Sequence, residues 1–111
     1  MSNRRRLKKR ISFVCGDMAA ECLVTRAFVE GADAEKLENC IREIAALQNE
    51  ALSRVNVHFD REPSDFANRH EYNKALKIFT GQAFASLTKD FNERVKAIVS
   101  EMNQALPAKK D

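Results

Sequence analysis

The chain contains 111 residues, of which 44% are hydrophobic and 32% are charged, with only three glycines and two prolines. This size predicts a single domain spanning residues 1–111, and the composition excludes collagen-like, low-complexity and disulfide-scaffold proteins. No stretch of about 18 uncharged apolar residues occurs, so we expect no membrane-spanning helix. The net charge of +3 is unevenly distributed, because the first 12 residues carry six cations and no acidic side chain.

Two helices are predicted in the first half of the chain. The first should cover residues 3–29 and stop at Gly31, and the second should cover residues 34–56 or 34–58 with Asp33 as its N-cap. In both, apolar residues recur every three or four positions, which is typical of amphipathic helices. The stripes are Leu7, Ile11, Val14, Met18 and Cys22 in the first helix, widened by Phe13, Ala20, Val24, Ala27 and Phe28, and Leu37, Ile41, Ile44, Leu47, Ala51 and Val55 in the second.

A third and longer helix is predicted after a turn at Pro63. It should begin at residue 65 or 66 and end near residue 106, before Pro107, and a separate short helix can form over residues 64–72. Residues 107–111 are expected to be a frayed tail. The apolar stripe of this segment is Leu76, Phe79, Ala83, Leu87, Phe91, Val95 (or Arg94), Ile98 and Met102.

Three amphipathic helices with short connections, and no alternating pattern typical of strands, predict an all-α fold. The expected architecture is an elongated antiparallel three-helix bundle, with a short fourth helix near residues 64–72 as an option. A helix of 25 residues is about 38 Å long, so such a bundle is thin. Broad apolar stripes and a third helix that outlasts the others leave apolar surface, which allows a homo-oligomer.

The most distinctive feature is the basic segment, residues 1–10, whose candidate anion or nucleic-acid contacts are Arg4, Arg5, Arg6, Lys8, Lys9 and Arg10. These cations oppose the macrodipole of the helix that they begin, and they repel one another. An anionic partner would compensate for both effects, and it could be nucleic acid, a lipid surface or an acidic protein. The alternative is a solvated, solubilising tail or one that pairs with the acidic middle of its own domain. Because no aromatic residue interrupts the basic run, nucleic-acid contact would be non-specific.

The sequence offers little support for catalysis or metal binding. The available soft ligands are Cys15, Cys22, Cys40, His58 and His70, but no C-x-x-C or H-x-x-x-H pair occurs. The three cysteines are expected to be reduced, buried core residues in a reducing compartment. We therefore predict no catalytic residue, no metal and no cofactor.

The opening of the chain resembles a family of small all-helical bacterial proteins of unknown function. The resemblance is carried by the basic run from Lys8 to Arg10 with Ile11, by Val14 and Cys15, and by Glu21 and Cys22, and it covers about 20 of the 111 residues. It implies a helical bundle in the bacterial cytoplasm, and it carries over no catalytic or ligand-binding residue.

The sequence as a whole predicts a cytoplasmic, non-enzymatic helical interaction module that self-associates and binds an anionic partner through its basic segment. The alternative function is that of a small, non-specific nucleic-acid-binding protein.

Overall fold

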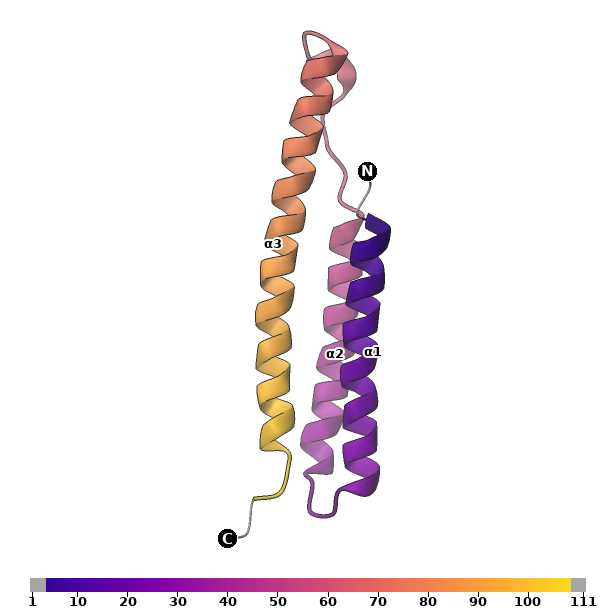
Figure 1. The fold of residues 1–111 in the computed structure, drawn as a ribbon, viewed down its shortest axis with the longest axis vertical. Helices are drawn as coiled ribbons and strands as arrows, with labels where there is room; N and C mark the ends of the chain where they lie inside the picture. Colours follow the sequence, from indigo (N-terminus) through magenta and orange to yellow (C-terminus); the bar gives the residue numbers. More distant parts are fainter. Residues whose placement is uncertain (1–3, 109–111) are drawn as a thin grey trace.

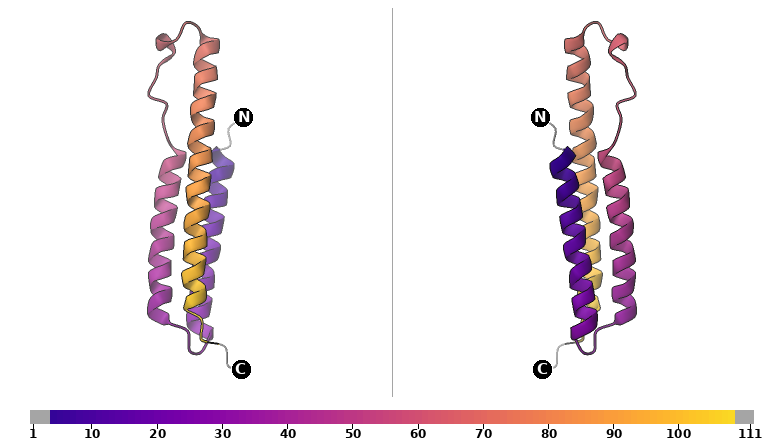
Figure 2. Two further views of the ribbon diagram at one scale, coloured as in Figure 1. Left: turned by 90° about the vertical axis from the view of Figure 1, so that its left-hand side faces the viewer. Right: turned by 90° about the vertical axis from the view of Figure 1, so that its right-hand side faces the viewer.

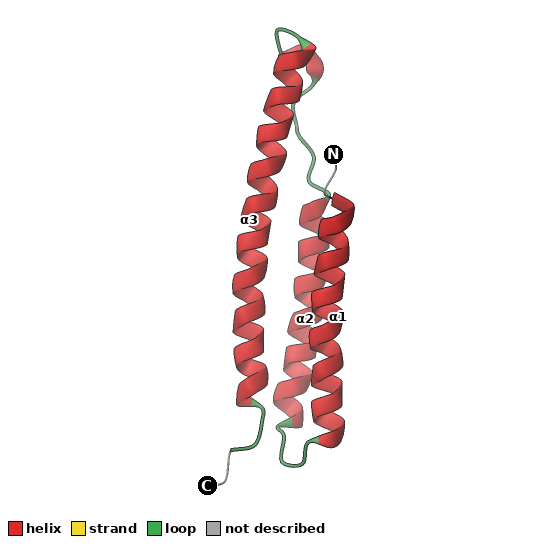
Figure 3. Cartoon of the chain, in the orientation of Figure 1, coloured by secondary structure: helices red, strands yellow, loops and turns green. Residues whose placement is uncertain are grey.

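The computed structural model describes residues 4–108 and contains three long helices. They are α1 (Arg4–Phe28), α2 (Ala34–Val55) and α3 (Arg69–Gln104), with a 3-10 turn η1 (Pro63–Asp65) between α2 and α3. The part of the chain that is described contains no strand (Figure 3). The molecule is a rod of 68 × 21 × 20 Å (Figure 1), so the predicted all-α, elongated fold is confirmed.

The three helices alternate in direction along the rod. Figure 1 shows α1 descending to a short turn, α2 returning beside it, and α3 descending again from a point well above the other two. The contacts between helices are mainly those of α2 with α1 and of α2 with α3. This arrangement is compatible with the predicted antiparallel bundle. In it α1 and α3 run in the same direction (Figure 2), and we call the boundary between these two helices the seam.

The core follows the predicted stripes in the first two helices. The buried set on α1 centres on Cys15, which the predicted stripe did not include, while Leu7 and Val14 lie at its edge. In α2 the predicted stripe is buried except at Ile41, which is partly buried, and Cys40 is buried beside it, because α2 packs against both other helices. The core is formed by Ile11, Cys15, Met18, Cys22, Leu37, Cys40, Ile44, Leu47, Ala51, Val55, Leu87, Phe91, Ile98 and Ala105.

The first part of α3 extends beyond the ends of α1 and α2 (Figure 1). We call residues 69–83 the overhang. Its apolar residues are only partly covered, and their cover comes from the loop that follows α2. Phe59 in that loop is the centre of an aromatic tip cluster, with ring centroids 5.1 Å from Phe79, 5.9 Å from Tyr72 and 6.2 Å from Phe66. The predicted α3 stripe is therefore divided between the bundle core and the tip cluster.

The short fourth helix near residues 64–72 is not formed. Pro63 begins a single 3-10 turn, closed when the Glu62 amide donates to the Asp65 carboxylate over 2.9 Å. The chain is then extended at Phe66 and Asn68, and the Asn68 side chain caps α3 by accepting a hydrogen bond from the Glu71 amide. Because this cap begins α3 at residue 69, the last residues of the predicted short helix belong to α3 itself.

The lower end of α3 is fastened to the turn between α1 and α2. The Asp33 amide donates to the Ala105 carbonyl over 2.8 Å, while the Asp33 side chain caps α2 as predicted. Gly31 has φ +86°, and Pro107 lies so close that a Cβ at position 31 would be 3.3 Å from the proline Cβ. We call this set of contacts the clasp. Pro107 is thus part of a packed contact, whereas residues 109–111 of the predicted frayed tail lie outside the described residues.

Candidate anion-binding groove

The six cations of the basic segment lie in the first turns of α1, and Arg4 contacts the rest of the bundle. The Arg4 guanidinium donates to the Val57 carbonyl, just beyond α2, over 3.0 Å, and it lies 6.0 Å from the centroid of the Phe84 ring. One side chain thus links the beginning of α1 to the other two helices. Arg4 therefore has a structural role within the bundle, and its predicted role as a contact for an anionic partner stays a prediction.

The remaining cations of the basic segment surround the exposed end of α1. Arg5, Arg6, Lys9 and Arg10 are exposed and Lys8 is half-buried. The first turn contains no acidic residue to balance the positive end of the helix dipole. Like charges four residues apart, such as Arg6 and Arg10, repel each other modestly on a helix. The beginning of α1 is therefore strongly electropositive.

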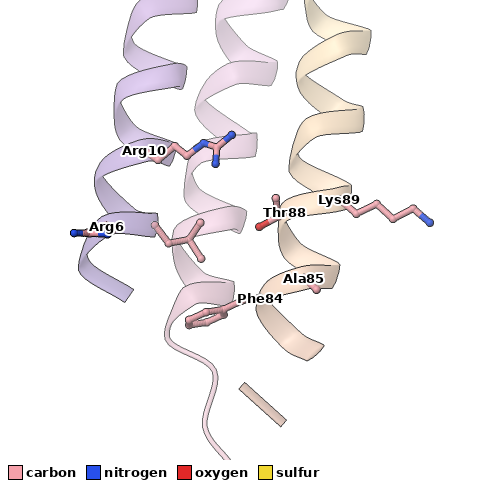
Figure 4. Close-up of a pocket in the computed structure, with 7 residues that line it drawn as sticks. Arg6, Arg10, Phe84, Ala85, Thr88 and Lys89 are labelled. Carbon is pink, nitrogen blue, oxygen red and sulfur yellow. The ribbon is translucent and has the colours of Figure 1, made fainter. Parts of the chain in front are cut away.

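Two of these cations line a groove between α1 and α3. The groove has a volume of about 830 Å³ and opens widely to solvent. Leu7 and Phe84 supply its apolar surface, and Thr88 supplies a hydroxyl. Its lining residues are Arg6, Leu7, Arg10, Phe84, Ala85, Thr88 and Lys89 (Figure 4).

The charged side chains of the groove do not converge on one point. In Figure 4, Arg10 reaches from α1 across the groove, whereas Arg6 and Lys89 point away from each other on opposite sides. A small anion bound at one point would meet at most one of these groups. A row of cations beside an apolar strip suits an extended partner that carries several negative charges.

Lys89 and Thr88 are groove residues that the sequence did not identify. Lys89 is an isolated exposed lysine in the middle of α3, and its spacing resembles that of any other outward-facing position. Its relevance depends on which turn of α3 stands beside the beginning of α1. The apolar pattern of the sequence does not reveal that register.

A second hollow lies lower on the same seam between α1 and α3, and its charge is opposite. It has a volume of about 470 Å³, and its charged residues are Asp17 and Glu21. Val24, Met102 and Leu106 give it an apolar surface. The seam is therefore basic at its upper end and acidic at its lower end.

The ion pairs of the structure lie at the other helix contacts. Within residues 4–108 the pairs join Arg26 to Glu38, Arg54 to Asp90 and Arg94 to Glu50, each linking α2 to one of its neighbours. None of these pairs includes a charged residue from either hollow.

The three thiols lie in the core, as predicted. Cys15, Cys22 and Cys40 are free and fully buried between α1 and α2. Burial raises the pKa of each thiol, and that of Cys40 reaches about 11, helped by Cys22, Glu101 and Glu43 nearby. The Cys40 Sγ is 3.9 Å from a Glu101 carboxylate oxygen and donates to it. Thiols held in the protonated form are poor nucleophiles at neutral pH.

The raised pKa of Cys40 gives a testable dependence of stability on pH. A raised pKa means that the folded state keeps its proton while the unfolded chain loses it, so stability is full below pH 9 and falls as the pH approaches 11. We expect the free energy of unfolding to fall by about 2 kcal/mol more in the wild type than in Cys40→Ala over that range. Urea denaturation at several pH values measures this difference, and parallel pH profiles for the two proteins would contradict it.

Two carboxyl groups form a small polar site beside Cys40. Partial burial and a hydrogen bond with Glu101 raise the pKa of Glu43, and nearby Arg94 opposes this shift. Within residues 4–108, no three histidine, cysteine or acidic side chains gather as metal ligands. His58 and His70 are both exposed, on the loop after α2 and at the beginning of α3.

Comparison with known proteins gives no further guide to the site. No family model matches the chain, and no curated protein or solved structure shows significant similarity to it. The resemblance of the first 22 residues to a bacterial family therefore stays a prediction. Among the described residues, no helix combines the length and apolar character needed to cross a bilayer.

Proposed function

We propose that the protein is a non-enzymatic helical interaction module of the bacterial cytoplasm. In this proposal an antiparallel three-helix bundle self-associates and binds an anionic partner through the basic end of α1. The observation that carries the proposal is the groove in which Arg6, Arg10 and Lys89 surround an apolar strip. These cations take part in none of the ion pairs that join the helices.

The energetics of α1 support a partner for this end. Arg5 and Arg6 stand in the first turn of α1, where a helix favours acidic residues, and each such mismatch costs about 0.3–1 kcal/mol at low salt. The core of the bundle does not depend on them, because their side chains are exposed. Binding of a polyanion would remove both the mismatch and the mutual repulsion, so it would stabilise α1.

Nucleic acid is the second candidate partner, because exposed cations surround α1 on several sides rather than forming one pocket. Such an arrangement can follow a phosphate backbone without reading its bases. Six contacts to phosphates would lower the affinity about a thousandfold between 50 and 200 mM salt.

Fluorescence anisotropy tests the proposal with three probes: a DNA duplex, a single-stranded oligonucleotide and a glutamate-rich peptide. We expect the double variant Arg6→Ala/Arg10→Ala to bind its probe at least tenfold more weakly than the wild type at about 50 mM salt. The matched control Lys74→Ala/Lys77→Ala removes the same charge from exposed positions on the overhang and should change binding less than twofold.

The three probes separate the candidate partners. Equal binding of both oligonucleotides with a steep salt dependence would favour non-specific nucleic-acid binding. A preference for the acidic peptide would favour a protein partner. If no probe binds at about 50 mM salt, where electrostatic attraction is strong, the proposed anion-binding role is wrong.

A further inference from the structure

The seam between α1 and α3 has a charge pattern that is complementary to itself. We propose that the anionic partner of the basic groove is the acidic half of α1 in a second copy of this chain, bound in the antiparallel direction. This inference rests on the proposed function and identifies the partner of the same site.

The spacing of residues on the seam side of α1 supports this pairing. This side reads Arg6, Arg10, Phe13, Val14, Asp17 and Glu21, with successive spacings of 4, 3, 1, 3 and 4 residues. These spacings are the same when read from either end. The two residues before the centre are cations, however, and the two after it are carboxylates. An antiparallel second copy therefore places Arg10 opposite Asp17 and Arg6 opposite Glu21, and the symmetry repeats both pairs.

The two hollows obey the same relation. The α1 residues of the basic groove are Arg6, Leu7 and Arg10, and those opposite them in this pairing are Glu21, Ala20 and Asp17. All three of the latter line the acidic hollow. The basic groove of one copy therefore lies level with the acidic hollow of the other.

The centre of the pairing is an exposed aromatic ring. Phe13 has 74% of its surface exposed and is the largest apolar side chain between the two charged halves. In the antiparallel arrangement Phe13 lies next to the two-fold axis, where it packs against the second copy. A buried aromatic at the centre with charged residues around it is the usual anatomy of a specific interface.

The seam can accept another helix because residues of α3 already line the side of it that faces α1. The α3 side presents Met102 and Phe84 at its two ends and Lys89 beside the basic groove. Within residues 4–108, neither the two arginines nor the two carboxylates of this face form an ion pair, so all are available. A parallel pairing would place cations against cations and is disfavoured.

The test is analytical ultracentrifugation of the full chain at about 50 mM salt and at concentrations up to about 200 µM. We expect a wild-type dimer that weakens as salt is added. Arg10→Glu and Asp17→Arg should each weaken the dimer at least tenfold, and the double variant Arg10→Glu/Asp17→Arg should restore the affinity to within about threefold of the wild type. Lys9→Glu is the matched control, because it reverses a charge on an adjacent, exposed face of α1.

A mixing experiment gives a gain of function that unfolding cannot imitate. The variant Arg6→Glu/Arg10→Glu has an entirely acidic face, and Asp17→Arg/Glu21→Arg has an entirely basic one. Each should be monomeric alone, and an equal mixture should form a heterodimer. Glutamates near the beginning of a helix are favourable, so the acidic variant should keep its helix content by circular dichroism.

The failure of this inference is distinct from failure of the proposed function. A wild-type monomer at about 200 µM, or a dimer that Lys9→Glu weakens as much as Arg10→Glu does, would overturn the pairing. Anion binding that depends on Arg6 and Arg10 in the anisotropy experiment would then still support the anion-binding part of the proposed function, while a monomer would remove its self-association. Rescue by the double variant and by mixing would establish the second copy as partner.

Discussion

Replacing Leu47 with alanine is expected to lower the free energy of unfolding by about 3 kcal/mol. Leu47 is 1% exposed, lies in the middle of α2 and borders Leu87 and Phe91 of α3. Because α2 contacts both other helices, a cavity at Leu47 removes packing at the place where the whole bundle converges. A thin rod has few other buried residues near this level that could move in and fill the space.

Urea denaturation followed by circular dichroism measures this loss, and the dependence of the free energy on urea should stay unchanged. The control is Ile78→Ala, which truncates an aliphatic side chain that is 53% exposed on α3. Its effect should be less than about 0.5 kcal/mol, since little apolar surface returns to water. A loss below about 1 kcal/mol for Leu47→Ala would contradict the central packing role of α2.

Replacing Phe79 with alanine is expected to loosen the overhang without unfolding the bundle. The Phe79 ring lies 5.1 Å from that of Phe59, and this contact joins the overhang to the loop after α2. Beyond the ends of α1 and α2, the overhang packs only against this loop and η1 in the described part of the chain (Figure 1). We expect a local loss of about 2 kcal/mol, because the ring is partly buried.

Amide hydrogen exchange distinguishes local from global opening. A local loss of about 2 kcal/mol makes exchange at residues 69–82 about 30-fold faster, while amides beside the core at residues 87–104 should keep their wild-type rates. Ile78→Ala again serves as control, because it changes the neighbouring position on the exposed side of the same helix. Uniformly faster exchange along α3 would show instead that the overhang and the bundle unfold together.

The helices could be predicted from the sequence because their signals are local. Apolar residues three or four apart and the Asp33 cap placed α1 and α2 to within a few residues of their observed bounds. Three large residues that were predicted to widen the stripe of α1, Phe13, Val24 and Phe28, are exposed instead. They lie outside the face that α2 covers, and periodicity alone does not show how wide a face the neighbouring helices can cover.

The candidate site could be predicted only in part. The run of cations is visible in the sequence, but the internal role of Arg4 depends on the Val57 carbonyl, which comes close only when the bundle forms. The contribution of Lys89 likewise depends on the register between α1 and α3. A run of like charges in the sequence predicts the sign of charge on a surface. Contacts between residues that are distant in the sequence determine which of those side chains can bind a partner.

The clasp at the lower end of α3 also determines which part of this helix can move relative to α1 and α2. With α3 held at Ala105 and Gly31, a rocking of α3 would have its pivot there, so displacement would grow with distance from that point. Thr88 is 17 residues above Ala105, or about 25 Å along the helix, so a 5° tilt would move it by roughly 2 Å. The basic groove would widen and narrow with such a motion, while the acidic hollow near the pivot would keep its width. The upper, basic end of the seam is thus more compliant than its lower, acidic end. Binding of a partner at the basic end should slow the rocking of the whole of α3.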